Sequence, residues 1–170
     1  MTNALHLDRE GEIAESNTCL RIFRNRPGLR YLGRIHEALA SYREEIEYID
    51  ATEELSIYHT GYLQSDESDV RKSKRNALLI EKVLEEEPDN YVMMGYLGDC
   101  YVNLKRYDEA VCLYEKVIAY FSDEELGEYD ARSAATFKNL MRVLLRMQKG
   151  VDALEKVYHQ AVRNLPKNGD

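Results

Sequence analysis

The stretch from Tyr91 to Ile118 decides the fold of this chain, and it reads YVMMGYLGDCYVNLKRYDEAVCLYEKVI. Apolar side chains recur in its first half at the spacing of one helix face, at Met94, Leu97, Tyr101 and Leu104. After the polar break Lys105-Arg106, a second face is formed by Ala110, Tyr114 and Val117. We expect two helices that pack as a hairpin, with the small residues Gly98 and Ala110 where the helices approach most closely.

This order of residues resembles a tetratricopeptide repeat, which follows the pattern W-x2-L-G-x2-Y, A-x3-F and P over about 34 residues. The positions that match or stand in for the pattern are Met94 (for the Trp), Leu97, Gly98, Tyr101, Ala110 and Tyr114. Ser122 falls where the closing Pro is expected. The alternative is an ordinary amphipathic helical hairpin, which does not require small and large residues in this register.

A further helix is predicted on the N-terminal side of this stretch, over 70–87, with Asp69 as its N-cap. Its apolar stripe is expected at Leu78, Leu79, Val83 and Leu84. Pro88 lies one repeat length before Ser122, so this helix is interpreted as the second helix of a repeat that lacks its first.

A second, degenerate repeat is predicted after an acidic insertion at 121–130. Leu140 and Ala153 have the same separation as Leu97 and Ala110, and Met141 takes the place of Gly98. The expected apolar faces are Phe137, Leu140, Leu144 and Met147 on one helix and Ala153, Val157, Ala161 and Leu165 on the next. The predicted fold class is therefore mainly α: tetratricopeptide-repeat helical hairpins (an α-α superhelix) over 66–170, with five helices, behind a small β-containing remnant.

Composition narrows the function classes. The net charge of -8 argues against non-specific nucleic-acid binding, and no apolar run is long enough to span a bilayer. No signal peptide is visible at the N-terminus. Cys19, Cys100 and Cys112 lack metal or redox spacing, which favours reduced thiols and a cytoplasmic location.

Residues 1–65 are predicted to contain extended segments. Ile13-Ala14 and 19–23 flank a polar four-residue link and are interpreted as a hairpin, followed by a turn at 25–28. Further extended pieces are expected at 31–35 and 56–62. The apolar spacing over 35–49 alone favours a helix, and we expect a helix or irregular turn there with an extended piece from about Ile46.

Three short pieces carry a second resemblance: RIFRN at 21–25, GRIHE at 33–37 and IYHTGY at 57–62. Their order and content resemble the C-terminal end of the catalytic domain in bacterial family-2 glycosyltransferases. In the resembling subfamily this end is followed directly by tetratricopeptide repeats, and residues 72–88 resemble that junction. The resemblance implies a parent protein that transfers a sugar from a nucleotide-sugar donor. The donor-binding half of such enzymes carries an Asp-x-Asp metal motif, and this sequence contains none.

The resemblance also implies roles for three residues in an intact parent. His36 and Glu37 would lie near the active site, where a His can exchange protons near neutral pH. His59 would complete a divalent-metal site (Mg or Mn) beside a nucleotide diphosphate. For this chain alone we favour the reading of His36-Glu37 as a turn pair and of His59 as a packed or solvated side chain, with no cofactor.

Two clusters of cations remain. Arginines without an intervening acid occur at Arg21, Arg24, Arg26, Arg30 and Arg34, and they suit either donor phosphates or a solvated edge strand. On the first helix of the second repeat, Lys138, Arg142 and Arg146 are spaced four apart and form one ridge. The ridge is interpreted either as a solvated face or as the wall of a groove that binds a protein or peptide partner.

The function predicted from the sequence is a protein-interaction module from the C-terminal part of a family-2 glycosyltransferase-like protein, without the donor-binding half. The alternative is a free-standing tetratricopeptide-repeat adaptor with no enzymatic activity. An in-frame nucleotide-sugar domain in the DNA upstream of Met1 would distinguish the first from the second.

Overall fold

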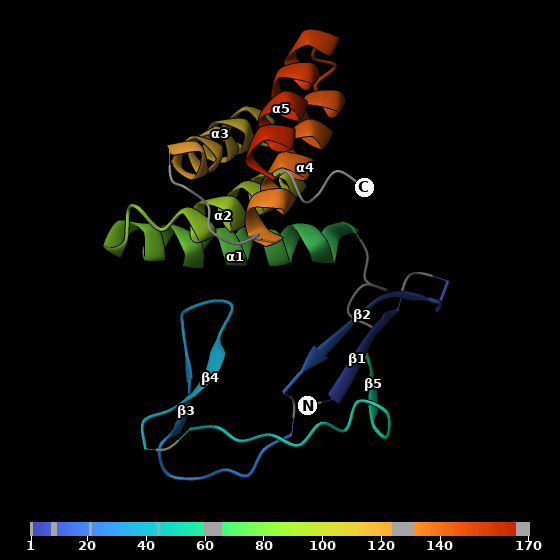
Figure 1. The fold of residues 1–170 in the computed structure, drawn as a ribbon, viewed down its shortest axis with the longest axis vertical. Coiled ribbons are helices and arrows are strands. Elements are labelled where there is room, and N and C mark those ends of the chain that lie inside the picture. Colours follow the sequence, from blue (N-terminus) through green and yellow to red (C-terminus); the bar gives the residue numbers. More distant parts are fainter. Residues whose placement is uncertain are drawn as a thin grey trace. The chain divides into compact units, whose positions relative to one another are not determined.

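The computed structural model describes residues 2–7, 10–20, 22–43, 45–59, 66–123 and 131–165. The chain divides into two compact units, Met1–Asp69 and Val70–Asp170. Strands form the first unit and helices the second (Figure 1). The described part is mainly helical with a small N-terminal strand region, as the sequence predicts.

The first unit contains a three-stranded sheet with β1 (Thr2–Leu7) at its centre. β2 (Ile13–Cys19) pairs with β1 in antiparallel register, and β5 (Ser56–His59) pairs with it in parallel. The chain turns between β1 and β2 through Gly11, whose φ of 86° suits a residue without a Cβ. The central strand holds the buried residues Thr2, Ala4, Leu5 and His6.

The predicted hairpin within residues 13–23 is wrong, because Ile13–Cys19 is one continuous strand. The polar run Ser16-Asn17-Thr18 was interpreted as a turn. In the structure these residues pair with 3–5 of β1 at the side of the sheet. β2 is an edge strand, and its Ser16, Asn17 and Thr18 side chains are exposed, so polar residues are tolerated there.

A second, two-stranded sheet is formed by β3 (Leu29–Leu32) and β4 (Ala38–Ser41). The predicted turn before it is present: the Leu29 N–H donates to the Arg26 carbonyl at 3.2 Å, and Gly28 has a φ of 98°. Pro27 followed by a glycine of positive φ is typical of a type II turn.

Of the helix or irregular turn expected early in residues 35–49, no helix forms in the described residues, which bend at 33–36 and then form the strand Ala38–Ser41. Two residues of the supposed helix face, Tyr42 and Ile49, are 67% and 84% exposed, so that face has no core to pack against. Residues 45–50 form no strand, although an extended piece was expected there.

The boundary between the two units falls within α1 (Asp66–Glu86), and Asp69 lies inside this helix and is not its N-cap. Asp69, like Asp66 and Glu67, lies near the N-terminus of the helix, where the dipole favours negative charge. Pro88 follows the helix end. The remaining helices are α2 (Tyr91–Asn103), α3 (Tyr107–Asp123), α4 (Ala131–Arg146) and α5 (Val151–Asn164). Residues 121–123 of the predicted insertion belong to α3, and 124–130 lie outside the described residues.

The turn that ends α2 is repeated at the end of α4. At the first turn, Lys105 has a φ of 61°, and the Arg106 N–H donates to the Tyr101 carbonyl at 2.9 Å. At the second, Gln148 has a φ of 55°, and the Lys149 N–H donates to the Leu144 carbonyl at 3.0 Å. Both are Schellman motifs with a non-glycine residue in the left-handed position. The predicted polar turns before α3 and α5 are therefore present and share one geometry.

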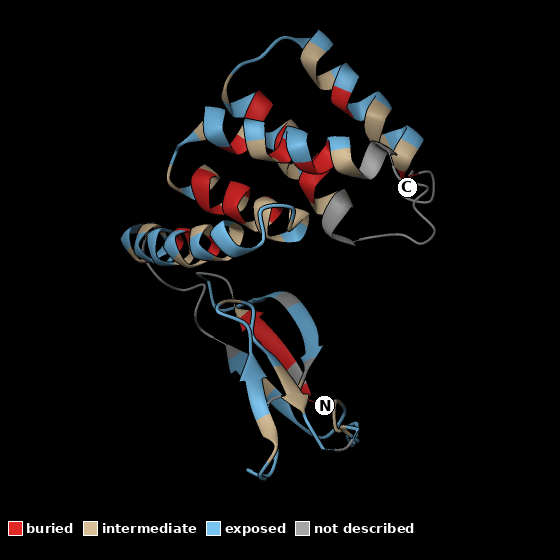
Figure 2. Cartoon of the chain, turned by 90° about the vertical axis from the view of Figure 1, so that its left-hand side faces the viewer, coloured by how far each residue is buried: buried red, intermediate tan, exposed pale blue. Residues whose placement is uncertain are grey.

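Buried residues of α2–α3 recur 43 positions later in α4–α5, and the two turns are separated by the same 43 positions. The pairs that share burial are Leu97 and Leu140, Cys100 and Val143, Tyr101 and Leu144, and Tyr114 and Val157. Figure 2 shows this core on the inner faces of the helices. The helical pairs α2–α3 and α4–α5 are thus two copies of one packing pattern.

The predicted stripe of α1 needs a correction. Its buried residues are Ser73, Ala77 and Ile80, whereas Leu78 is 62% exposed. Position 78 lies on the opposite side of the helix from position 80 at 100° per residue. The helix therefore packs through a narrower face, which includes small and polar side chains.

Candidate functional site

The predicted ridge Lys138, Arg142 and Arg146 lies on α4, and all three side chains are exposed. On the opposite side of α4, the side chains of Phe137, Leu140, Val143 and Leu144 are buried, so the ridge faces solvent. With respect to other described residues, none of the three cations takes part in a salt bridge. Arg146 also lies in the last helical turn, where a cation is favoured by the helix dipole.

A polar junction joins three helices beside this ridge. The Asp99 carboxylate on α2 accepts a hydrogen bond from the Tyr114 hydroxyl of α3 at 2.7 Å. The same oxygen, Oδ1, accepts from Nδ2 of Asn139 on α4 at 2.8 Å. Hydrogen bonds to an ionised acceptor are stronger than neutral ones, so the junction links the first helical pair to the second. No local sequence pattern identifies Asn139, because its partner Asp99 lies 40 positions away in the chain.

Gly98 provides the close approach that the sequence predicts. A Cβ placed at this glycine would lie 2.5 Å from Cε1 and 2.9 Å from Cδ1 of Tyr114. The Tyr114 ring is fully buried and cannot swing away. The neighbour of Gly98 is therefore the Tyr114 ring, one helical turn beyond the Ala110 that was expected there. This packing brings the Tyr114 hydroxyl to Asp99.

A second set of polar contacts links α1 to the α2–α3 hairpin. The Tyr101 hydroxyl donates to Oε1 of Glu81 at 2.9 Å, and the Arg106 guanidinium lies 3.8 Å from the centroid of the Tyr101 ring. Burial raises the pKa of Tyr101, and the hydrogen bond to the Glu81 carboxylate raises it further. Arg106 also pairs with Glu109, and this hydrogen bond lowers the pKa of the Glu109 carboxyl. A hydrogen bond from Asn103 Nδ2 to Ser73 Oγ, at 3.1 Å, adds a further link to α1.

The residues assigned to an intact parent lie in the first unit. His36 and Glu37 are exposed in the loop between β3 and β4, and His36 has a φ of 54°, as expected for a turn residue. His59 ends β5, which belongs to the other sheet, and its side chain lies outside the described residues. His6, which no sequence pattern singled out, is buried and 3.0 Å from the Asn17 side-chain nitrogen.

The described arginines of the run suit both of its interpretations, as ligands of donor phosphates or as part of a solvated edge strand. Arg24, Arg26, Arg30 and Arg34 are exposed, and Arg21 lies outside the described residues. Arg30 Nη1 donates to the carbonyl of Leu29 at 2.6 Å, an arrangement that holds its guanidinium against the backbone of its own strand.

No group of three metal-ligating side chains occurs within the described ranges. None of the described helices is both long and apolar enough to cross a membrane.

The chain is similar to two glycosyltransferases. The chain is 29% identical over 98 residues to the SPbeta prophage-derived glycosyltransferase SunS of Bacillus subtilis (strain 168), and to the same degree to the glycosyltransferase SunS of Bacillus phage SPbeta. In both cases the match covers 58% of this chain and 23% of the relative. No family model matches the chain. The similarity is weak, and it supports a relationship to a glycosyltransferase.

Proposed function

We propose that the chain is a protein-interaction module of the tetratricopeptide-repeat type from the C-terminal part of a family-2 glycosyltransferase-like protein. The parent would transfer sugar from a nucleotide-sugar donor with the help of a divalent metal, in the cytoplasm. The helical unit would bind a protein or peptide partner through the ridge on α4. The repeated pattern of burial and turn geometry in α2–α3 and α4–α5 is the observation that carries the proposal.

Repeat arrays bury their helices against neighbouring repeats and leave one helix of each pair free to contact a ligand. Here α2 packs against both α3 and α4, and α4 packs against α5. The Asp99 junction fixes α4 relative to the first pair. A rigid α4 would present the ridge with little loss of conformational entropy on binding.

The first unit supports the part of the proposal that concerns a larger domain. Its described side chains include many large apolar ones that are exposed, at Ile13, Ile22, Phe23, Tyr31, Leu32, Tyr42, Tyr48, Ile49, Leu55 and Tyr58. Monomeric soluble domains seldom expose so many in so short a segment, and such surfaces mark contacts with other structure. A catalytic domain that contains these strands would cover them.

The partner proposed for the ridge is an acidic peptide segment. Three cations at a spacing of four repel one another, and no described acid neutralises them by direct pairing. An acidic ligand would relieve this repulsion and would associate more slowly as salt screens the charges.

The test is the binding of a fluorescein-labelled Glu-rich peptide, measured by fluorescence anisotropy at low and at high salt. Reversal of two ridge charges, Arg142→Glu with Arg146→Glu, should abolish binding and its salt dependence. The matched control is Lys74→Glu with Lys82→Glu, which makes the same change in net charge on the exposed face of α1. Equal loss in both variants would indicate only a general charge effect, and unchanged binding in the ridge variant would assign the ridge to solvent.

A further inference from the structure

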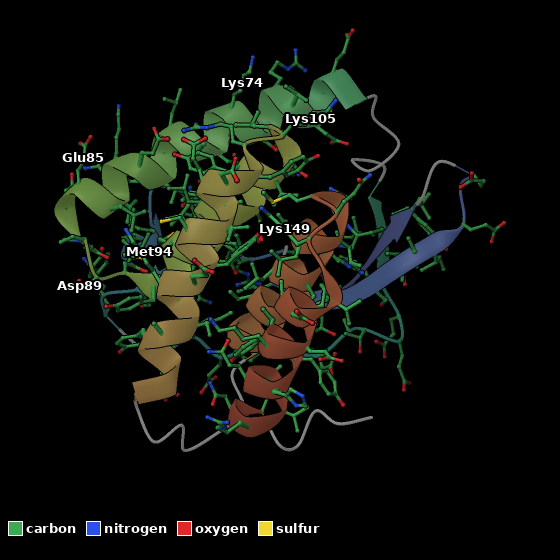
Figure 3. The ribbon with its side chains drawn as sticks, turned by 90° about the horizontal axis from the view of Figure 1, so that it is seen from above. Lys74, Glu85, Asp89, Met94, Lys105 and Lys149 are labelled. Carbon is green, nitrogen blue, oxygen red and sulfur yellow. The ribbon has the colours of Figure 1, made fainter. Side chains whose placement is uncertain are left out.

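Away from the ridge, the helical unit has an open hollow of about 610 Å³ at the end where α1 turns into α2. Its lining comes from the turn between the two helices, the first turn of α2 and the last turns of α3: Pro88, Asp89, Tyr91, Met94, Lys116, Ala119 and Tyr120. Figure 3 labels two of these residues, Asp89 in the turn and Met94 on α2. All of the lining belongs to one compact unit.

Two stacked tyrosines line this hollow. The rings of Tyr91 and Tyr120 stack with their centroids 3.7 Å apart and an angle of 14° between their planes. The pair ties the start of α2 to the end of α3, and both side chains are only half-buried. Tyr91, Tyr120 and Met94 line the hollow and are each half-buried, so part of their apolar surface is open to a ligand with an apolar face.

Two side chains of opposite charge flank the rings. Asp89 and Lys116 are exposed, and neither is in a salt bridge with another described residue. A ligand with a net charge of either sign would be attracted by one of these groups and repelled by the other. A neutral ligand that both donates and accepts hydrogen bonds can use both groups, because a carboxylate only accepts and an ammonium only donates.

We propose that this hollow, defined by Tyr91, Tyr120, Asp89 and Lys116, binds a pyranose sugar. The C–H face of a pyranose ring would lie on the tyrosine surface, and its hydroxyl groups would donate to Asp89 and accept from Lys116. The inference goes beyond the proposed function, since it needs neither a peptide partner nor a nucleotide sugar. In a protein related to a glycosyltransferase, such a site would retain a glycan or a glycosylated product apart from the ridge.

The test uses the methyl signals of the methionines in the full chain, labelled with ¹³C at the methyl group. Met94 lines the hollow, whereas Met141 and Met147 belong to the second helical pair and serve as internal references. Titration with methyl α-D-glucopyranoside, methyl β-D-galactopyranoside and N-acetylglucosamine should shift the Met94 signal with at least one sugar and leave the references in place. Mannitol, an open-chain polyol without a ring face, should cause no shift.

Variants identify the groups that hold the sugar. Lys116→Gln and Asp89→Asn should each weaken binding roughly tenfold, as expected for the loss of a hydrogen bond to a charged group. Tyr120→Phe should keep binding, and Tyr120→Ala should remove it. Tyr158→Ala, at an exposed tyrosine on α5 outside the hollow, is the control and should bind like the parent chain.

The proposal is overturned if no sugar moves the Met94 signal, or if mannitol moves it equally. It is also overturned if a neutral proline-containing peptide, Gly-Pro-Tyr-Pro, shifts Met94 when the sugars do not, because the hollow would then be a peptide site. Should Tyr120→Ala unfold, the charge-neutralising variants at Lys116 and Asp89 still decide the outcome, since both positions are exposed. Failure of this test leaves the acidic-peptide experiment on the ridge unaffected.

Discussion

The strand-containing unit and the helical unit distribute their apolar residues in opposite ways. In the helical unit, the side chains of Ile80, Tyr114, Val117, Leu140 and Val143 are almost completely buried. Among the described residues of the strand unit, the buried apolar ones are Ala4 and Leu5, whereas Tyr42, Ile49 and Tyr58 are more than 60% exposed. Because apolar burial is the main favourable term in folding, the helical unit has a core of its own, whereas the described part of the strand unit buries little apolar surface.

The largest expected effect separates the two units. Residues 66–170 expressed alone should keep their helical circular dichroism and unfold cooperatively, because their core is internal. Residues 1–65 alone should show no cooperative transition, since two small sheets bury too little apolar surface to offset chain entropy. A cooperative transition in the 1–65 fragment would show that the strand unit has a sufficient core of its own.

Within the helical unit, the largest single effect is expected at Gly98. Replacement by Leu should lower the free energy of unfolding by about 1–3 kcal/mol through overpacking against the buried Tyr114 ring. Gly150→Ala is the matched control, because nothing lies within 4 Å of the added Cβ; Gly150 is the N-cap of α5, where Ala is less favourable than Gly, so this change should cost no more than about 1 kcal/mol. Urea unfolding measures both, and equal midpoints would show that the register of the hairpin is wrong.

The Asp99 junction should contribute a smaller, coupled effect. Tyr114→Phe and Asn139→Ala should each cost about 1–2 kcal/mol, since each removes one hydrogen bond to the same carboxylate. Both changes act on one acceptor, so the double variant should depart from additivity by at least about 0.5 kcal/mol. Strict additivity in urea unfolding would mean that the two helical pairs are not linked through Asp99.

The smallest expected effect is a change of stability with pH. The pKa of Tyr101 is raised in the folded state, so its contribution to stability is complete below its unfolded pKa, about 10, and is lost as pH rises through the folded value. Tyr101→Phe should be less stable by about 1 kcal/mol at pH 8 through loss of the hydrogen bond to Glu81. The difference between the two proteins should shrink at pH 11. A difference that stays constant with pH would show that Tyr101 does not titrate with folding.

Sequence periodicity predicts the helical unit well, because each amphipathic helix records its own buried face. The spacing at Leu97, Tyr101 and Tyr114 identifies side chains that are buried in the structure. The predicted stripe of α1 includes the half-buried Leu79, Val83 and Leu84 but wrongly includes the exposed Leu78, and it misses Ser73 and Ala77, which an apolar pattern does not register. Hydrogen bonds between distant residues, such as Asn139 to Asp99, depend on tertiary placement and leave no local signal.

The strand unit was harder to predict because strand pairing is non-local. β1 and β5 are neighbours in the sheet although they lie more than 40 residues apart in the chain. The short strand Ala38–Ser41 carries too few residues for its period to be distinguished from that of a helix. The turn at Pro27-Gly28 was predictable, since its conformation is set by the residue types themselves.

If this chain is an interaction module, as proposed, it should not use a nucleotide-sugar donor by itself. The most direct measurement is isothermal titration calorimetry of the full chain with uridine diphosphate in the presence of Mn²⁺, repeated with a chelator. We expect weak binding or none, and no difference between the two conditions. Low-micromolar binding that requires the metal would contradict it and would place a donor site within these residues.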